Sequence, residues 1–206
     1  MSVRKEKKAE TRQMLMTAAI QVFHEKGIHA ARISDIVARA GVAQGTFYYH
    51  FASKQAVFNQ IADDYLDHYS RLFRDYTTAI FDHDDTDAML RSIRDFLRQL
   101  LLSCRDNIAI ARLVFGEGAG SAGPYQEKCQ AIIGHFIALI RDVLDQAAAR
   151  QWITMQDTEM TAAMIFGLFQ RCMFYYLLTK NEFDLDRFEQ GMTDFLINGV
   201  GLREKF

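Results

Sequence analysis

Residues 41–54, GVAQGTFYYHFASK, contain an unusual concentration of side chains that form hydrogen bonds and contact anions. Gly45 lies between Gln44 and Thr46, and five ring-bearing residues follow without interruption. Amide, hydroxyl, imidazole and ammonium groups donate to phosphate oxygens and to the edges of nucleic-acid bases. A helix that only covered a core would space its large apolar residues three or four positions apart. The adjacent polar rings therefore indicate a surface that contacts another molecule.

Charge distinguishes the N-terminal part from the rest of the chain. The 206 residues have a formal net charge of -2, but residues 1–54 contain nine Lys or Arg and four Asp or Glu, which gives +5. Residues 55–206 therefore carry -7. This asymmetry predicts a polyanionic partner, double-stranded DNA above all, for the N-terminal quarter alone.

The composition predicts an all-α protein of about nine helices. The chain has a single proline, Pro124, while Ala, Leu, Arg, Glu, Gln and Met recur at the helical period. Cys104, Cys129 and Cys172 lie far apart and have no second ligand at metal-binding spacing, so we expect reduced thiols. Neither a metal nor a cofactor is expected.

Four helices are predicted around the opening motif. The first covers about 7–26 and stops at Gly27, the second covers 34–40 and stops at Gly41, and the third covers 44–50. Ser53 is a suitable N-cap for a long fourth helix that extends to about residue 80.

Five further helices are predicted after a loop at residues 82–85. Their ranges are about 86–103, 105–115, 122–149, 157–179 and 184–199. The glycine-rich segment 116–124 follows a helical pattern and lacks the Gly-Lys-Ser/Thr ending of a phosphate-binding loop, so we expect a flexible linker.

Two short helices joined by a tight, glycine-containing turn predict a helix-turn-helix, whose second helix enters the major groove of DNA. Gln44 at the start of that helix can make two hydrogen bonds to adenine, and Thr46 offers a hydroxyl and a methyl group. Gly45 lets the backbone approach closely. We therefore predict a DNA-binding domain at residues 1–54 and an effector-binding and dimerisation domain at residues 55–206.

At these positions the sequence resembles the tetracycline-repressor (TetR) family of bacterial transcription regulators. The matching residues are Ala18, Phe23, Gly27, Ile36, the run Ala40 to Val42, the run Gly45 to Tyr48, Phe51, Ser53 and Lys54. The resemblance covers about the first quarter of the chain. It implies a three-helix DNA-binding head and a helical body that dimerises and binds a small effector.

The resemblance also implies roles for individual residues. Gln44, Gly45 and Thr46 fall where family members contact base edges. The positions where family members hold phosphates are Tyr48, Tyr49, His50 and Lys54.

Two positions differ from the family pattern. Ala31 and Arg32 replace a usual Thr or Ser before the second helix, and Ala43 replaces a usual Ser before the third. Each change removes a hydroxyl cap worth about 1 kcal/mol. Arg32 and Ser34 are expected to compensate by contacting phosphate.

Structural alternatives remain for several of these residues. Phe47 and Phe51 are four apart and are predicted to belong to the core of the head. Tyr48 could be partly buried with its hydroxyl exposed, and His50 could be an ordinary surface histidine.

A dimerisation surface is predicted because one helix-turn-helix covers too short a DNA segment for specificity. Residues 160–178, MTAAMIFGLFQRCMFYYLL, are apolar on almost every side, which predicts contact with both the own domain and a second copy. Burial inside the domain is the alternative. The candidate dimerisation residues are Phe166, Phe174, Phe188, Met192 and Phe195.

A ligand pocket is predicted within the helical body, although for each candidate taken singly ordinary packing is the commoner role. The apolar candidates are Phe96, Phe115, Phe136, Ile140, Phe169 and Met173. The polar candidates are His135, Gln170 and Tyr176. This lining favours a small hydrophobic or aromatic effector.

Together these features predict a cytoplasmic homodimeric repressor that an effector releases from a pseudo-palindromic operator, with the fourth helix as the only rigid connection to the head. An activator or a ligand-blind DNA-binding adaptor is the alternative. A helical enzyme or carrier lacks support, because no nucleophile with a base, metal cluster or cofactor loop is recognisable. We expect no signal peptide and no apolar run of bilayer length, hence no membrane partner.

Overall fold

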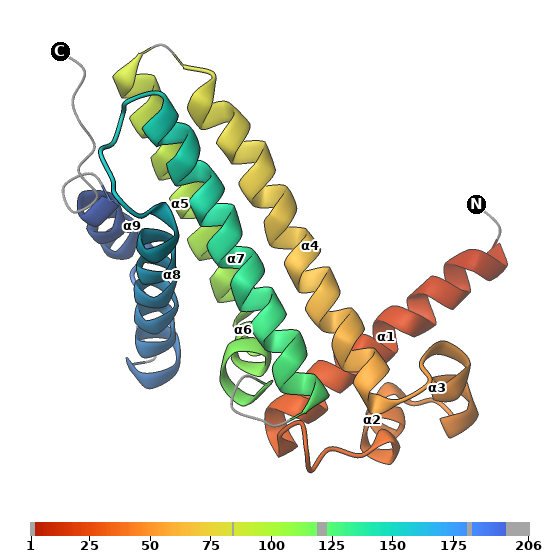
Figure 1. Cartoon of the computed structure of the whole chain (residues 1–206). Coiled ribbons are helices and arrows are strands. Elements are labelled where there is room, and N and C mark those ends of the chain that lie inside the picture. The colour runs from red at the N-terminus through yellow and green to blue at the C-terminus, as the bar shows by residue number, and fades with distance from the viewer. Residues whose placement is uncertain (1–2, 84, 119–122, 181–182, 197–206) are drawn as a thin grey trace. The chain divides into compact units, whose positions relative to one another are not determined.

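The computed structural model describes residues 3–83, 85–118, 123–180 and 183–196. Nine α-helices and two short π-helical segments form the regular structure of these residues (Figure 1), which confirms the all-α prediction. The chain divides into two compact units. The first contains Met1–Leu66 and Ala109–Ile132, and the second contains Asp67–Ile108 and Ile133–Phe206.

The first unit contains the predicted helix-turn-helix. Its elements are α1 (Val3–Lys26), α2 (Ile33–Ala40), α3 (Gln44–His50), the beginning of α4 (Lys54–Phe81), most of α6 (Ile108–Arg112), the π-helical η1 (Leu113–Gly118) and the first turns of α7 (Pro124–Ala149).

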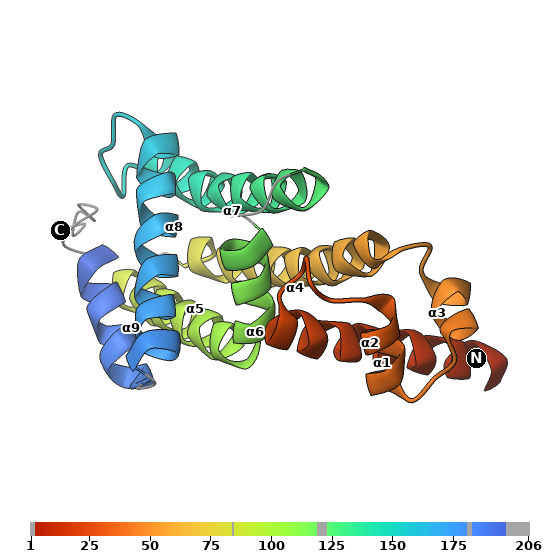
Figure 2. The ribbon, with the colours of Figure 1, turned by 90° about the horizontal axis from the view of Figure 1, so that it is seen from below.

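The second unit contains the remainder of α4 and α7 together with three further helices. These are α5 (Thr86–Asp106), α8 (Thr158–Phe174), which continues as the π-helical η2 (Tyr175–Lys180), and α9 (Leu185–Asp194). α5 packs against α9, and α8 and α9 lie side by side in both views (Figure 1 and Figure 2).

The predicted helices agree with the structure in number and order. The third helix has the expected bounds, whereas the predicted helix at 105–115 is a short α-helix followed by η1. Residues 116–118 of the predicted linker are therefore helical, and residues 119–122 lie outside the described ranges. The predicted end of the last helix, residues 197–199, also lies outside them.

The core of the first unit is organised by one face of α1. Its buried residues are Leu15, Ala18, Ala19, Val22 and Phe23. Their spacing of three and four places them on one side of the helix. α1 ends where Gly27 adopts φ 77°, a left-handed conformation that glycine reaches without strain.

The second segment of the first unit, Ala109–Ile132, packs on elements of the first segment. The Tyr125 ring contacts the rings of Phe58 and His29 at centroid distances of 5.0 and 5.8 Å. Lys128 forms an ion pair with Asp63. The residues that support the helix-turn-helix thus come from two distant parts of the sequence, and the predicted domain boundary at residue 54 stays a prediction.

Three helices, α4, α6 and α7, have residues in both units, and α4 and α7 are the long ones. The expectation that the fourth helix is the only rigid connection stays a prediction, although α7 is also a continuous helix with residues in both units. Its first turn contains Tyr125, which packs against the helix-turn-helix unit.

The second unit is held together by an apolar cluster and by aromatic contacts. The buried cluster consists of Leu144, Ala147, Ile153, Ala162 and Ile165. Arg98 on α5 forms ion pairs with Asp186 and Glu189 on α9, each at 2.7 Å. Cys104 and Cys129 are buried free thiols and Cys172 is a half-buried one, as predicted.

Candidate nucleic-acid interface

The turn between α2 and α3 is formed by a glycine in the left-handed region. Gly41 adopts φ +67°, and the amide of Val42 donates to the carbonyl of Val37 at 3.1 Å, which ends α2. Open space surrounds the position that a Cβ of Gly41 would occupy, so backbone conformation rather than packing requires glycine here. The link from α2 to α3 is three residues long, Gly41 to Ala43.

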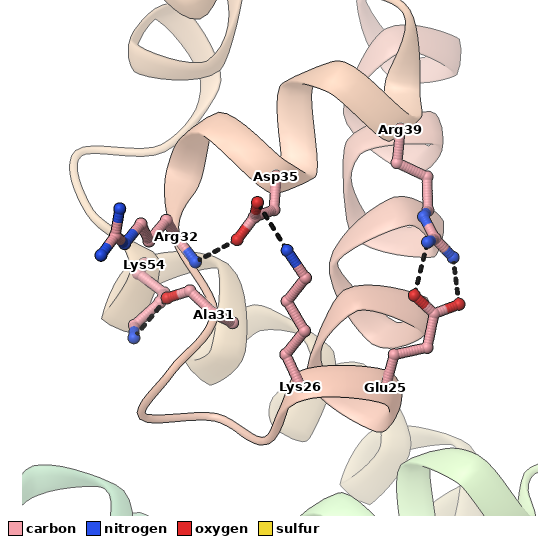
Figure 3. A network of polar contacts seen from close by, with 7 residues as sticks. All are labelled: Glu25, Lys26, Ala31, Arg32, Asp35, Arg39 and Lys54. Atoms are coloured by element: carbon pink, nitrogen blue, oxygen red, sulfur yellow. Dashed lines mark hydrogen bonds and ion pairs between the residues drawn. The ribbon is translucent and has the colours of Figure 1, made fainter.

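The start of α2 is capped by a carboxylate instead of a hydroxyl. The amide of Arg32 donates to Asp35 Oδ2 at 3.0 Å, and the same carboxylate forms an ion pair with Lys26 at 2.7 Å (Figure 3). The bond from Lys26 holds the pKa of Asp35 below its usual value. Asp35 therefore binds the amide of the N-cap residue, but neither Arg32 at α2 nor Ala43 at α3 makes the side-chain bond that a hydroxyl N-cap would make to the first-turn amides.

Two phenylalanines anchor α3 in the first unit. The side chains of Phe47 and Phe51 are buried, with ring centroids 5.8 Å apart. Burying each ring contributes about 2–3 kcal/mol. The prediction that these two residues belong to the core is confirmed, and their inward orientation fixes which side of α3 is exposed.

The first turn of α3 presents the predicted base-contacting residues to solvent. Gln44 and Gly45 are exposed, and Thr46 is half-buried. A Cβ built on Gly45 would meet nothing within 4 Å. Internal packing does not require glycine at this position, which leaves room for an external surface to approach the backbone.

The end of α3 combines exposed aromatic rings with nearby cations. Tyr48 and Tyr49 are 52% and 65% exposed, and Tyr48 also packs edge-on against Phe47. Tyr48 is thus partly a packing residue, as one alternative proposed, while its ring remains mostly accessible. Arg32 and Ser34, at the start of α2, are also exposed.

His50 is not an ordinary surface histidine. Its Nδ1 is shielded from solvent and has no hydrogen-bond partner, and its ring packs edge-on against Tyr49 at 5.1 Å. Burial lowers the pKa of His50 below 6.5, and the charges of Lys8 and Arg12 lower it further. The free protein therefore holds a neutral imidazole beside two cations.

Sequence reasoning missed both of these α1 cations. Lys8 Nζ lies 5.0 Å from the ring centroid of Tyr49, and the guanidinium of Arg12 lies 5.0 Å from that of Phe51. Arg12 also donates to Gln60 Oε1 at 2.7 Å. Their spacing of four residues, which places both on one face of α1, was the available signal.

Lys54 lies at the start of α4, as predicted, and its side chain is directed at backbone carbonyls. Its Nζ donates to the carbonyls of Ile28 at 2.7 Å, His29 at 3.0 Å and Ala31 at 2.8 Å. Figure 3 shows the ammonium group directed at the connection between α1 and α2. The three N–H donors of this side chain are therefore already bonded to carbonyls, and none is left over for the predicted phosphate contact.

The predicted pocket residues are distributed over several contacts in the structure. Phe115 belongs to the first unit, where its ring packs against Tyr65 at 5.9 Å. In the second unit, Phe136 stacks on Phe166 at 6.0 Å, and Phe96 packs against Phe73 at 5.0 Å.

The other pocket candidates also differ in their surroundings. Ile140 packs on the buried apolar cluster, Met173 is buried, and Gln170 is half-buried. The exposed His135 shares a hydrogen bond with Ser70 at 3.2 Å.

A cavity of about 330 Å³ lies between α8, η2 and α9. Of the nine predicted pocket residues, its lining contains only Tyr176. A second one, Phe169, lies outside the lining but packs against the lining residue Phe188. The lining residues are Leu168, Cys172, Tyr176, Phe183, Asp184, Arg187, Phe188, Gly191, Met192 and Phe195. Three of these were predicted as dimerisation residues.

The predicted dimerisation segment is largely uncovered. Thr158–Lys180 is long and apolar enough to span a membrane by length and composition, yet only 11% of its most apolar window is buried. This corrects the expectation that no apolar run reaches bilayer length. The exposed apolar residues of the segment are Met160, Met164, Leu168, Tyr175 and Leu178.

The named dimerisation candidates lie mostly elsewhere. Phe166 stacks on Phe136 within the unit, Met192 is buried, and Phe174 and Phe188 are half-buried. Phe195 is 42% exposed. The exposed apolar face of the predicted segment therefore consists of residues other than the named candidates, and the dimer contact itself stays a prediction.

A short helix with exposed hydrogen-bonding groups, held by a glycine turn on a preceding helix and flanked by cations, defines a helix-turn-helix DNA-binding protein. Residues 15–61 match the family model described as bacterial regulatory proteins, tetR family. Residues 15–61 therefore carry the DNA-binding domain of the TetR family, and the chain is a DNA-binding transcriptional regulator.

Relatives extend over nearly the whole chain. The HTH-type transcriptional regulator YvdT of Bacillus subtilis (strain 168) is 27% identical over 92% of this chain and 94% of its own length. A protein of Escherichia coli (strain K12) named as the probable acrEF/envCD operon repressor is 26% identical over 90% of this chain and 84% of its own.

A solved structure has the same fold. The transcriptional regulator FadR from Bacillus subtilis, in complex with stearoyl-CoA, matches with a TM-score of 0.74 and 19% identity. The match covers 91% of this chain and 98% of that one.

Proposed function

We propose that this protein is a homodimeric repressor that binds a pseudo-palindromic operator and is released from it by a small apolar effector. The observation that carries the proposal is the division of α3 into two faces. Buried Phe47 and Phe51 fix the helix, so that Gln44, Gly45 and Thr46 are presented at its accessible N-terminal turn.

Base contacts are assigned to the first turn of α3. The Gln44 amide suits adenine, and the open space around Gly45 admits the DNA surface. Phosphate contacts are assigned to the hydroxyls of Tyr48 and Tyr49 and to the imidazole of His50, with Arg32 and Ser34 at the start of α2. The phosphate contacts position the protein, and the base contacts in the first turn of α3 provide specificity.

The DNA-binding role is tested by selecting binding sites from random-sequence DNA with the purified protein. A palindrome should emerge, and Gln44→Ala should relax base preference at one position in each half-site by about 1–3 kcal/mol. Failure to enrich any sequence would reject the assignment. A substitution of Gln170, in the second unit, is the control and should leave the preference unchanged.

Dimerisation is assigned to the exposed apolar face of α8 and η2, together with α9. A soluble protein rarely leaves a continuous apolar helix face in water, and a second copy would cover it across a two-fold axis. The same arrangement supplies the second recognition helix that a palindrome requires. A protein of this kind acts in the cytoplasm.

The effector is assigned to the helical body and is expected to be apolar, since aromatic and aliphatic side chains dominate its interior. The FadR structure contains stearoyl-CoA, which makes a long-chain acyl-CoA the first compound to test. Repression is favoured by the relative named as an operon repressor.

Release is measured by titrating the protein-operator complex with acyl-CoA esters of different chain length and with free CoA. An effector that prefers the DNA-free state should weaken operator binding in proportion to its differential affinity. Equal binding of the operator at saturating effector would reject release, and stronger binding would indicate the activator alternative.

A further inference from the structure

The connection between α1 and α2 is fixed by a lysine that is distant in sequence. Lys54 reaches back to Ile28, His29 and Ala31, which precede it by 26, 25 and 23 residues. An ammonium group has three N–H donors and no acceptor. Three carbonyl bonds of 2.7–3.0 Å therefore use its full donor capacity.

The position of the ammonium group also argues against an exposed phosphate contact. Lys54 is half-buried, and burial lowers the pKa of its side chain. Its partners are carbonyl oxygens near the C-terminal end of α1, where the helix dipole favours a cation. A phosphate would have to displace bonds that already satisfy the charge.

The segment that Lys54 holds leads directly into the helix-turn-helix. Ala31 precedes Arg32, the N-cap of α2, and α2 leads through Gly41 to α3. On the same connection, the His29 ring contacts Tyr125 of α7. The start of α2 is thus tied to the first residue of α4 by three hydrogen bonds.

We propose that Lys54 is a positioning residue that fixes the start of α2 for operator binding, and that it does not contact a DNA phosphate. The inference rests on the proposed DNA-binding function. Lys54 acts on specificity through the placement of α2 and α3, so its loss affects the operator more than DNA of random sequence.

Salt dependence distinguishes positioning from phosphate contact. Each phosphate contact contributes about 0.9 to the slope of log affinity against log salt concentration. Lys54→Met should weaken operator binding about tenfold with an unchanged slope, because methionine retains the length but has no donor. The ratio of operator to random-sequence affinity should fall. Lys8→Met, which removes an exposed cation beside Tyr49, is the matched control and should reduce the slope.

A second variant separates donors from charge and keeps the test valid if Lys54→Met unfolds. Lys54→Gln has two N–H donors and no charge, so it should retain more operator affinity than methionine and keep the wild-type slope. Thermal unfolding of each variant verifies the fold before the titrations.

Three results would overturn the inference: a slope reduced in Lys54→Gln or Lys54→Met, equal losses on operator and random DNA, or unchanged operator affinity in Lys54→Met. Failure of the wild-type protein to bind any DNA would instead reject the proposed function, so the two failures are distinguishable.

Discussion

Gly45 is a glycine that the packing of the folded chain does not require. Open space surrounds the position of its missing Cβ, and it lies in the first turn of α3. Gly45→Ala should therefore stabilise the protein by about 0.4–1 kcal/mol, because the unfolded chain loses freedom. The same methyl group should weaken operator binding about tenfold by blocking close approach. Thermal unfolding and operator titration measure the two opposite effects.

Gly134 provides the control for this change. It lies within α7 and also has open space around the position of a Cβ. Gly134→Ala should bring a similar gain in stability and leave operator binding unchanged. Equal operator affinity for Gly45→Ala and the wild type would show that DNA does not approach this turn closely.

His50 should make operator binding depend on pH. Its pKa in the free protein is lowered by burial and by Lys8 and Arg12, so the unfolded chain takes up the proton more readily. The stability that neutral His50 supports is thus present above pH 6.5 and lost as the pH falls through the folded pKa. A nearby phosphate reverses the shift, because its negative charge favours the imidazolium ion.

Operator binding should therefore take up a proton at His50 and strengthen as the pH falls from about 7.5 to about 5.5. His50→Gln should flatten that part of the profile, because the variant has no group at this position that takes up the proton. The measurement is operator affinity against pH at constant ionic strength. Parallel profiles for the two proteins would place His50 away from phosphate.

For single residues, the sequence predicted contacts between neighbours in the chain but not contacts between residues far apart in the sequence. Phe47 and Phe51 are four apart on one helix, so their shared burial followed from spacing alone. The partners of Lys54 precede it by more than twenty residues, and family resemblance suggested a different role. Long-range contacts of this kind have no local periodicity from which to infer them.

At the scale of elements, the short α2 and α3 were well predicted because glycine stops and apolar spacing agree there. The π-helical segments were missed, since an i→i+5 turn leaves the apolar pattern close to that of an α-helix. The packing of Ala109–Ile132 in the first unit was also missed, because it depends on tertiary contacts.

Tyr125 tests that packing. Its half-buried ring contacts Phe58 on α4 and His29 beside the Lys54 bonds, and burial raises the pKa of its hydroxyl. Tyr125→Ala should destabilise the protein by about 2 kcal/mol and weaken operator binding, because the α1–α2 connection loses one support. Chemical unfolding and operator titration measure both effects.

Tyr125→Phe is the matched control, since it retains the ring and removes only the hydroxyl. It should remain within about 0.5 kcal/mol of the wild type in stability and keep its operator affinity. If the alanine variant lost stability but bound the operator normally, α7 would support the fold without influencing the DNA-binding elements.

For the whole molecule, the proposed dimer depends on the uncovered face of α8. Met164, near the start of the apolar segment, is 64% exposed. Met164→Glu should leave the fold of the monomer intact but place a charge in the dimer interface, which costs several kcal/mol unless it is paired. Sedimentation equilibrium should then show a monomer at concentrations where the wild type is a dimer, and operator affinity should fall because only one half-site is held.

Met14→Glu is the control, because Met14 is another exposed apolar residue, 43% accessible on α1 in the first unit. It should not change the oligomeric state. A wild-type protein that stays monomeric would leave the α8 face for another occupant, and binding to lipid vesicles that Met164→Glu abolishes would identify that occupant as a membrane. A dimer that survives Met164→Glu would place the two-fold axis elsewhere, because a buried carboxylate at the centre of an apolar helix pair cannot be solvated by either copy.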